Sequence, residues 1–382
     1  MKKNIVLFFL TVLGVFALIN SVGYGVRVFL EPKLLSVNAG YQLYIHLSST
    51  VLDFPSSNSL KFSLGFSPNV WEINQGLREA ADEPKISSAL IHLDSVRLTI
   101  SQAWVVGEAI QYFRSKGKKV ICYSTSFDSK NGGLPAYVLA SYCDAIQVQQ
   151  LGAVVLETLK YDDVLGENDT AGVKDLGVLT HIGERINSII RENRSSALRY
   201  QEPIVNNKHY IDTQALNVGL IDSVVSGVAQ SEYTLVIQDY VRVLEKSQKN
   251  KGNVIAVIPI SDGVEDDTFK AICSRSDVRA VVIHNDSKSD VNYGAQKIGN
   301  KSVVVYGADL ESIVGRKDNL NDAIDRAIKL AALYKPTVRV EIIHPGSLVS
   351  HIMKDLLRLG KSMVSMFKRS VNYVTNMVYK IE

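Results

Sequence analysis

Apolar and polar positions in the middle of the chain follow the order strand, helix, strand. Residues 89–93 (Ala-Leu-Ile-His-Leu) form a short apolar run typical of a buried strand. Between residues 103 and 113 apolar side chains recur every three to four positions, which predicts a helix that ends at Gly117. Residues 120–123 are the next apolar run. Two strands and a helix within about 35 residues form a βαβ crossover, which predicts parallel, buried strands.

The same strand occurs a second time. Residues 281–287 read Val-Val-Ile-His-Asn-Asp-Ser, against Ala-Leu-Ile-His-Leu-Asp-Ser at 89–95. Downstream, the segment 117–123 is echoed at 299–306, where glycine and lysine again precede an apolar run that ends in tyrosine. A repeat of this length exceeds a solenoid unit and predicts two copies of one α/β domain. The second copy is abbreviated after residue 305 and lacks a segment that the first retains.

Further periodic segments extend this α/β pattern along the chain. Helices are predicted at 69–81, 135–141, 212–218, 234–246, 265–273 and 319–333, and strands within 40–66 and at 145–148 and 254–260. The polar, basic segment 246–253 has no periodicity and marks a domain boundary. We therefore expect tandem α/β domains with mostly parallel sheets. The predicted parts are an N-terminal segment (1–30), a first domain (31–245), a linker (246–253), an abbreviated second domain (254–335) and a C-terminal strand and tail (336–382).

Composition narrows the classes of function. At 382 residues the chain can bury two cores, and its formal net charge of +3 is too small to indicate a nucleic-acid partner. It contains neither a glycine-rich phosphate loop nor a nucleic-acid-binding motif, and we expect no cofactor and no metal. Cys122, Cys143 and Cys273 lack metal-ligand spacing and are interpreted as packing residues that define no redox compartment.

The N-terminus has the pattern of a membrane-targeting segment. Lys2 and Lys3 precede an unbroken apolar run from Ile5 to Ile19, and apolar residues resume at 22–26. The run alone suits a signal peptide, whereas the extended segment is long enough to cross about 30 Å of hydrocarbon. Small residues near its end leave cleavage open. We favour an uncleaved single-pass anchor in a bacterial-type inner membrane, with the N-terminus cytoplasmic and the body exported to the periplasmic side.

The C-terminal residues 350–382 form a second distinctive segment. Apolar residues recur at three- to four-residue intervals from Ile352 to Val378, with lysines and arginines among them. One interpretation is a basic amphipathic helix on an anionic membrane surface. The other is a helix that packs on the body or on another subunit. The sequence leaves both open.

Four segments, in this order and spacing, resemble the signal peptide peptidase A (protease IV) family. They are 89–94, 113–120, 137–146 and 215–222, and the resemblance extends over residues 60–335. The family consists of membrane-anchored serine peptidases of the Clp-protease/crotonase-like fold, and its long form has two domains in tandem. The resemblance implies a homo-oligomer with shared active sites, peptide ligands, and a serine nucleophile activated by a lysine base.

The sequence departs from the family at each catalytic position. Ile186 stands where the base lysine is expected, and the neighbouring Arg185 cannot act as a base because it stays protonated. The oxyanion turn after the second repeated strand is Asp-Ser-Lys-Ser-Asp at 286–290, without glycine. The nucleophile turn falls in the segment that the second copy lacks. We therefore expect a catalytically impaired homologue that acts as a scaffold or peptide-binding assembly; the alternative is an active serine endopeptidase that degrades cleaved signal peptides with a relocated nucleophile.

Ser129 is the candidate for such a relocated nucleophile. It follows Ser124 and Ser126 and precedes Asn-Gly-Gly, and Lys130 beside it is the conceivable base. Adjacent residues rarely direct their side chains at each other, so a polar loop rich in turn residues is the simpler interpretation.

Histidines offer two further candidates. His92 and His284 end the repeated strands, where duplication explains both without a catalytic role. His181 and Glu184 would be neighbours on one helix face, but two residues do not make a metal site.

Overall fold

The computed structural model describes residues 40–54, 67–157, 176–195, 205, 208–248, 252–260, 272, 274–285, 301–307, 320–331 and 338–343. The predicted anchor and the C-terminal tail lie outside these residues. No helix in the described part is long and apolar enough to cross a membrane. Contacts within the chain group it into two compact units, unit 1 mainly before Asn250 and unit 2 mainly from Lys251 onward.

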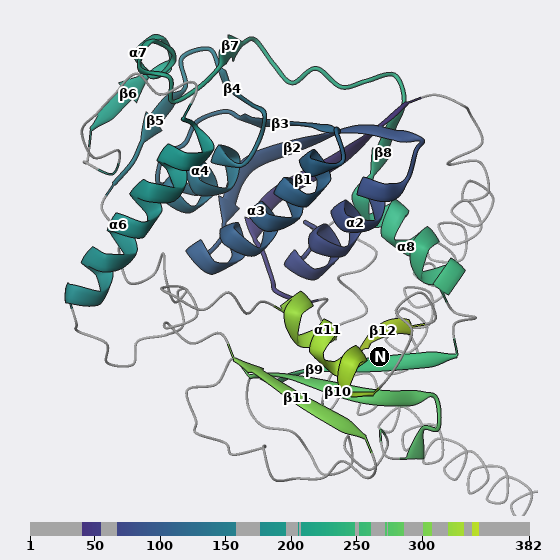
Figure 1. The fold of residues 1–382 in the computed structure, drawn as a ribbon. Coiled ribbons are helices and arrows are strands. Elements are labelled where there is room, and N and C mark those ends of the chain that lie inside the picture. The colour runs from purple at the N-terminus through teal and green to yellow at the C-terminus, as the bar shows by residue number, and fades with distance from the viewer. Residues whose placement is uncertain are drawn as a thin grey trace, which may run out of the picture. The chain divides into compact units, whose positions relative to one another are not determined.

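Unit 1 is built on a six-stranded parallel sheet (Figure 1). Its strands are β1 (Tyr41–Thr50), β2 (Ile86–Arg97), β3 (Lys119–Ser124), β4 (Ala145–Gln149), β7 (Ser223–Val225) and β8 (Thr234–Val236), in the order β7-β4-β3-β2-β1-β8. A separate antiparallel pair joins β5 (Ala153–Val155) to β6 (His209–Ile211). The predicted α/β class with parallel strands is confirmed.

The helices of unit 1 are α2 (Val70–Asp82), α3 (Ile100–Ser115), α4 (Gly133–Ser141), α6 (Leu176–Asn193), α7 (Asp212–Val218) and α8 (Ile237–Gln248). Capping boxes start two of them: Asn69 and Glu72 exchange side-chain-to-backbone hydrogen bonds of 2.9 and 3.1 Å at α2, and Thr99 and Gln102 do the same at α3. Figure 1 shows α2, α3 and α4 side by side on one side of the sheet.

One predicted helix begins too early. The pattern at 234–246 predicts a helix throughout, but residues 234–236 form β8, which pairs with Gln42–Tyr44 of β1. The prediction is wrong there because three residues are too few to show a strand period, and the adjacent sheet edge supplies hydrogen bonds that no local pattern reveals. The helix α8 then continues to Gln248, into the predicted linker.

The two faces of the sheet differ in chemistry. Leu43, Ile45 and Leu47 of β1 are buried in the core shared with the helices. Alternate residues of a strand point to opposite faces, so Tyr44 and His46 belong to the other face, where they are half-buried. Unit 1 thus has one apolar sheet face and one that carries polar and aromatic side chains.

Two of the three cysteines are linked. Cys122 on β3 and Cys143 after α4 form a disulfide, with Cα atoms 6.0 Å apart, and both are buried. The expectation that they serve only in packing is therefore wrong for this pair. The register of β3 with β4 sets Cys122 opposite Ile146, only three residues beyond Cys143. Cys273 lies outside the described residues.

Unit 2 contains a four-stranded parallel sheet in the order β11-β10-β9-β12. Its elements are β9 (Asn253–Ile260), β10 (Val278–Asn285), β11 (Ser302–Gly307), α11 (Leu320–Leu330) and β12 (Val338–Ile342). This order matches β3-β2-β1-β8 of unit 1, and α11 confirms the helix predicted at 319–333. The described residues of unit 2 include no counterpart of β4 or β7.

Details of the two sheets repeat as well. Tyr41 N–H donates to Lys85 O, and at the equivalent place Val254 N–H donates to Asp277 O. His92 lies opposite Tyr123, as His284 lies opposite Tyr306. These shared positions show that the sequence repeat is a repeat of structure.

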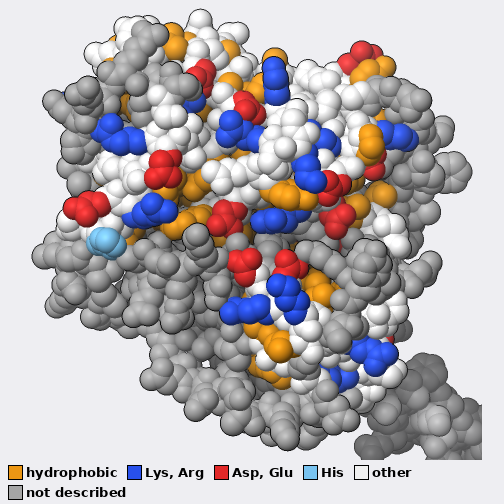
Figure 2. Space-filling view, viewed as in Figure 1, with side chains coloured by type: hydrophobic (Ala, Val, Ile, Leu, Met, Phe, Trp, Pro, Cys, Tyr) orange, Lys and Arg blue, Asp and Glu red, His pale blue; other side chains and the backbone are white. Residues whose placement is uncertain are grey.

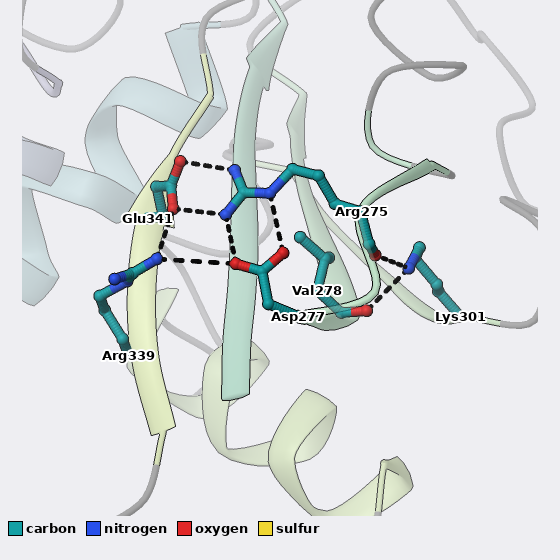
Figure 3. A network of polar contacts seen from close by, with 6 residues as sticks. All are labelled: Arg275, Asp277, Val278, Lys301, Arg339 and Glu341. Carbon is teal, nitrogen blue, oxygen red and sulfur yellow. Dashed lines mark hydrogen bonds and ion pairs between the residues drawn. The ribbon is translucent and has the colours of Figure 1, made fainter. Parts of the chain in front are cut away.

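Lysines reinforce the same place in both units. Lys118 Nζ donates to the carbonyl oxygens of Ala80 and Glu83. In unit 2, Lys301 Nζ donates to the carbonyl oxygens of Arg275 and Val278 (Figure 3). Each lysine precedes the third repeated strand and binds backbone carbonyls near the start of the second, which explains why a lysine recurs at this place in the sequence.

An ion-pair network attaches the edge strand β12 in unit 2 (Figure 3). Arg275 binds Glu341 through two hydrogen bonds of 2.7 and 2.9 Å, and Asp277 through two of 3.0 and 2.7 Å. Arg339 adds a bond of 3.1 Å to Glu341. Such bidentate arginine–carboxylate contacts fix the relative orientation of the two side chains as well as pairing their charges.

Candidate functional site

The position expected for a lysine base lies inside the apolar core. Ile186 sits on α6 with 1% of its surface exposed, packed in the main core of unit 1. Arg185 beside it points elsewhere: its guanidinium lies 5.8 Å from the centre of the Trp104 ring and 4.0 Å from Glu192. An aliphatic side chain in this position can neither take nor give a proton.

The C-terminal end of β2 contains the first copy of the turn where an oxyanion site is expected. The first copy of the turn, Asp94 to Arg97, continues as strand, with Ser95 in the left-handed region at φ 49°. The Ser95 N–H donates to the side-chain oxygen of Asn131 at 3.3 Å. This backbone N–H is thus engaged within the fold. The second copy, at 286–290, lies outside the described residues.

Ser129 lies in a turn organised by its neighbour Asp128. The Asp128 carboxylate accepts from the N–H groups of Lys130 and Asn131 at 2.9 and 3.1 Å, and its carbonyl accepts from Gly133 N–H at 2.7 Å. Ser129 and Lys130 are exposed, and no hydrogen bond to either side chain is found within the described segments. The arrangement is that of a side-chain-closed turn.

Gly132 lets this loop approach β2 closely. It has φ 87°, and an added Cβ would lie 2.6 Å from the Val96 carbonyl oxygen. Gly132 therefore serves a close backbone contact.

The two serines upstream are buried and structural. Ser124 Oγ donates to the Ser126 carbonyl at 2.6 Å. Ser126 Oγ donates to the Ala153 carbonyl at 2.8 Å and accepts from Ala153 N–H at 3.1 Å, which attaches the loop to β5. Neither hydroxyl is accessible as a nucleophile.

His181 and Glu184 do lie together on α6, with 3.9 Å between Nδ1 and Oε2. Both side chains are largely exposed. No third ligand-type side chain of the described residues joins them.

The structure brings together a polar cluster that the sequence did not predict. His46 on β1 and His92 and Asp94 on β2 each offer one ligand atom, and these three atoms lie within 4.8 Å of one another. The imidazole rings of His46 and His92 stack with centroids 4.7 Å apart. All three residues are half-buried.

Strand register builds this cluster. His46 is the register partner of His92, and Ser48 is that of Asp94. His92 and Asp94 are two residues apart on one strand, so they share a face of the sheet. The only local signal is the alternation Tyr-x-His at 44–46. This pattern does not show which residues of another strand lie beside Tyr44 and His46, so the sequence alone does not predict the cluster.

Aromatic hydroxyls surround the histidines. Tyr44 Oη lies 2.9 Å from His92 Nδ1. The Tyr123 ring meets His92 edge-on at 4.9 Å, and its hydroxyl donates to Gln149 at 3.2 Å. This contact with Tyr44 leaves Nε2 as the free nitrogen of His92.

Electrostatics favour a neutral imidazole at His92. Burial lowers the pKa of His92, and the adjacent His46 lowers it further, while Asp94 acts in the opposite direction. The Nε2 atom of His46 is buried and has no hydrogen-bond partner in the described part of the chain. A neutral imidazole with a free nitrogen is a proton acceptor or a metal ligand.

The equivalent place in unit 2 lacks the pair. His284 of β10 lies opposite Pro259 of β9, where unit 1 has His92 opposite His46. The histidine at the strand end is therefore a repeated structural position. The second imidazole belongs to unit 1.

No family model and no curated protein matches the sequence. Among solved structures, the chain is similar to a mutant of the membrane-bound stomatin-specific protease 1510-N in complex with a substrate peptide, at 12% identity and TM-score 0.32 over 78% of this chain and 100% of that one. A peptidase from Plasmodium falciparum matches at 13% identity and TM-score 0.32 over 52% and 100%. An enoyl-CoA hydratase/isomerase family protein from Silicibacter pomeroyi matches at 11% identity and TM-score 0.27 over 41% and 64%. At such TM-scores these likenesses assign neither family nor activity.

Proposed function

We propose that this chain is a membrane-anchored relative of the signal peptide peptidase A family that lacks peptidase catalysis and acts as a scaffold or peptide-binding assembly. The observation that carries the proposal is the burial of Ile186, at 1% exposure, in the position that the family gives to its base. Without a base to accept its proton, a serine hydroxyl is a weak nucleophile.

Two further observations support it. The Ser95 N–H donates a hydrogen bond to the Asn131 side chain. Ser124 and Ser126 are buried, and their hydroxyls donate to backbone carbonyls. Ser129 is the accessible serine of this loop, and no hydrogen bond joins its side chain to a base among the described residues.

Labelling with a serine-reactive fluorophosphonate tests the proposal. We expect the purified full-length chain to remain unlabelled, at the level of its heat-denatured form. Ser129→Ala is the matched variant. Labelling that this substitution abolishes would establish the alternative, an active endopeptidase with a relocated nucleophile. Labelling that persists in it, mapped by mass spectrometry to another serine, would equally overturn the proposal.

The scaffold role implies assembly and membrane attachment. We expect the full chain to stay with membranes after alkaline carbonate extraction and to elute as a homo-oligomer in detergent, as light scattering would show. A chain that is released by carbonate and elutes as a monomer would contradict this part while leaving the catalytic prediction intact.

A further inference from the structure

The cluster of His46, His92 and Asp94 has the composition of a transition-metal site. Two imidazole nitrogens and one carboxylate oxygen form a donor set that zinc and its neighbours bind, whereas magnesium and calcium prefer oxygen alone. We propose that unit 1 binds one Zn²⁺-class divalent ion through these three side chains, on the polar face of its sheet.

The distances are close to those a metal needs. Zinc–nitrogen and zinc–oxygen bonds of about 2.0–2.2 Å in a tetrahedron place ligand atoms about 3.3 Å apart. The three candidate atoms now lie at most 4.8 Å apart. Rotation about side-chain bonds can supply movements of this size.

The supporting contacts fit a ligand role. A metal-bound histidine usually has its other ring nitrogen hydrogen-bonded, which fixes its tautomer and orientation. Tyr44 Oη does this at His92 Nδ1, 2.9 Å away. His46 adds a buried Nε2 that has no partner within the described residues.

The scaffold is rigid where the ligands stand. His46 and His92 lie in direct register on adjacent strands of the six-stranded sheet, and neither strand is at its edge. Three protein ligands leave a fourth coordination position for water. Catalytic zinc sites have this composition, whereas structural zinc sites have four protein ligands. In unit 2 the counterpart of His46 is Pro259, so the pair of nitrogens is specific to unit 1.

Metal titration of the full-length chain tests this site. The protein is stripped with a chelator, exchanged into metal-free buffer and titrated with Zn²⁺ in competition with a chromophoric chelator, and Co²⁺ serves as a spectroscopic substitute. We expect one ion per chain, at least about 100-fold weaker binding in His46→Asn, and weaker binding in Asp94→Asn. Tyr44→Phe, which removes only the outer contact, should weaken binding about 10-fold.

His181→Asn is the matched control, because His181 also lies beside a carboxylate but is exposed on α6. It should bind Zn²⁺ like the unaltered chain. Fluorescence of Trp71 and Trp104, both in unit 1, checks that each variant is folded. Tyr44→Phe and Asp94→Asn change the side-chain volume least, so these two variants test the site if His46→Asn does not fold. Absence of one-to-one binding, or binding that Asp94→Asn and Tyr44→Phe leave unchanged, would overturn the proposal. So would a loss in His181→Asn equal to the loss in the cluster variants.

Discussion

Two aspartate–arginine pairs in unit 1 share a geometry and differ in the burial of the arginine. Asp222 accepts the Ile146 N–H at 2.7 Å and binds Arg194 at 2.8 and 2.9 Å. Asp144 accepts the Val120 N–H at 2.7 Å and binds Arg114 at 2.7 Å. The carboxylates are similarly exposed, but the Arg194 side chain is 4% exposed and that of Arg114 33%.

Replacing each aspartate with alanine should therefore have unequal effects. Both changes remove a hydrogen bond to the first residues of a strand. Asp222→Ala also leaves the buried guanidinium of Arg194 with only the Gly219 carbonyl, at 3.1 Å, among its described partners. Breaking a buried pair costs about 3–5 kcal/mol and an exposed one at most about 1 kcal/mol. Because water reaches Asp222, we take the lower end and expect Asp222→Ala to cost about 2–3 kcal/mol more than Asp144→Ala.

Urea unfolding followed by tryptophan fluorescence measures this difference. The chain has two tryptophans, Trp71 and Trp104, and both lie in unit 1, so the signal reports on that unit. Adding Arg194→Met to Asp222→Ala removes the unpaired charge and should restore most of the lost stability. Equal losses in the two alanine variants, or no recovery in the double variant, would refute the reasoning from burial.

Two other changes test the packing of each unit. Glu341→Gln should weaken the attachment of β12 by about 1 kcal/mol, which amide exchange would detect as faster exchange in β9 and β12. Arg275 holds the pKa of Glu341 below its usual 4.5, so the stability that the Glu341 carboxylate contributes is complete above pH 4.5 and is lost as the pH falls through the lower folded pKa. The variant should lack this pH dependence. Gly107→Ala should destabilise unit 1 by about 1–3 kcal/mol, because the new Cβ would lie 2.5 Å from the Tyr142 ring. A thermal shift no larger than that of Gly227→Ala, where the added atom meets nothing within 4 Å, would contradict this.

The surface explains why charge said little about partners. On the face shown in Figure 2, lysine and arginine side chains lie among aspartate and glutamate. Among the described residues, some charges of opposite sign are paired directly, as Lys116 is with Asp82 at 2.7 Å. Charges neutralised locally in this way create no large field of one sign on that face.

The sequence predicted those parts of the fold that local patterns encode. The apolar runs at β2 and β10, the lysines before β3 and β11, and the helices α2 and α11 all show their period or punctuation within a few residues. The strand β8 did not, because its three residues acquire their structure from the edge of β1. The Cys122–Cys143 link likewise depends on the pairing of β3 with β4.

The candidate site was harder to predict for the same reason. The repeat in the sequence relates His92 to His284 and gives no sign of its spatial neighbour. Its actual neighbour is His46, which the register of β1 with β2 places directly opposite. A contact across parallel strands depends on the crossover connection between the strands and on their register. Neither can be predicted from the residues near His46.

The difference between the two copies bears on whether His46 has a task. At this strand position unit 2 carries Pro259, which has no side-chain polar atom to satisfy. Unit 1 carries an imidazole whose buried Nε2 lacks a partner among the described residues, an arrangement that costs about 1–3 kcal/mol. The repeated sheet forms without a histidine at that position, so the fold does not require one. A metal ion shared with His92 and Asp94 would satisfy the nitrogen and turn this cost into a gain in stability.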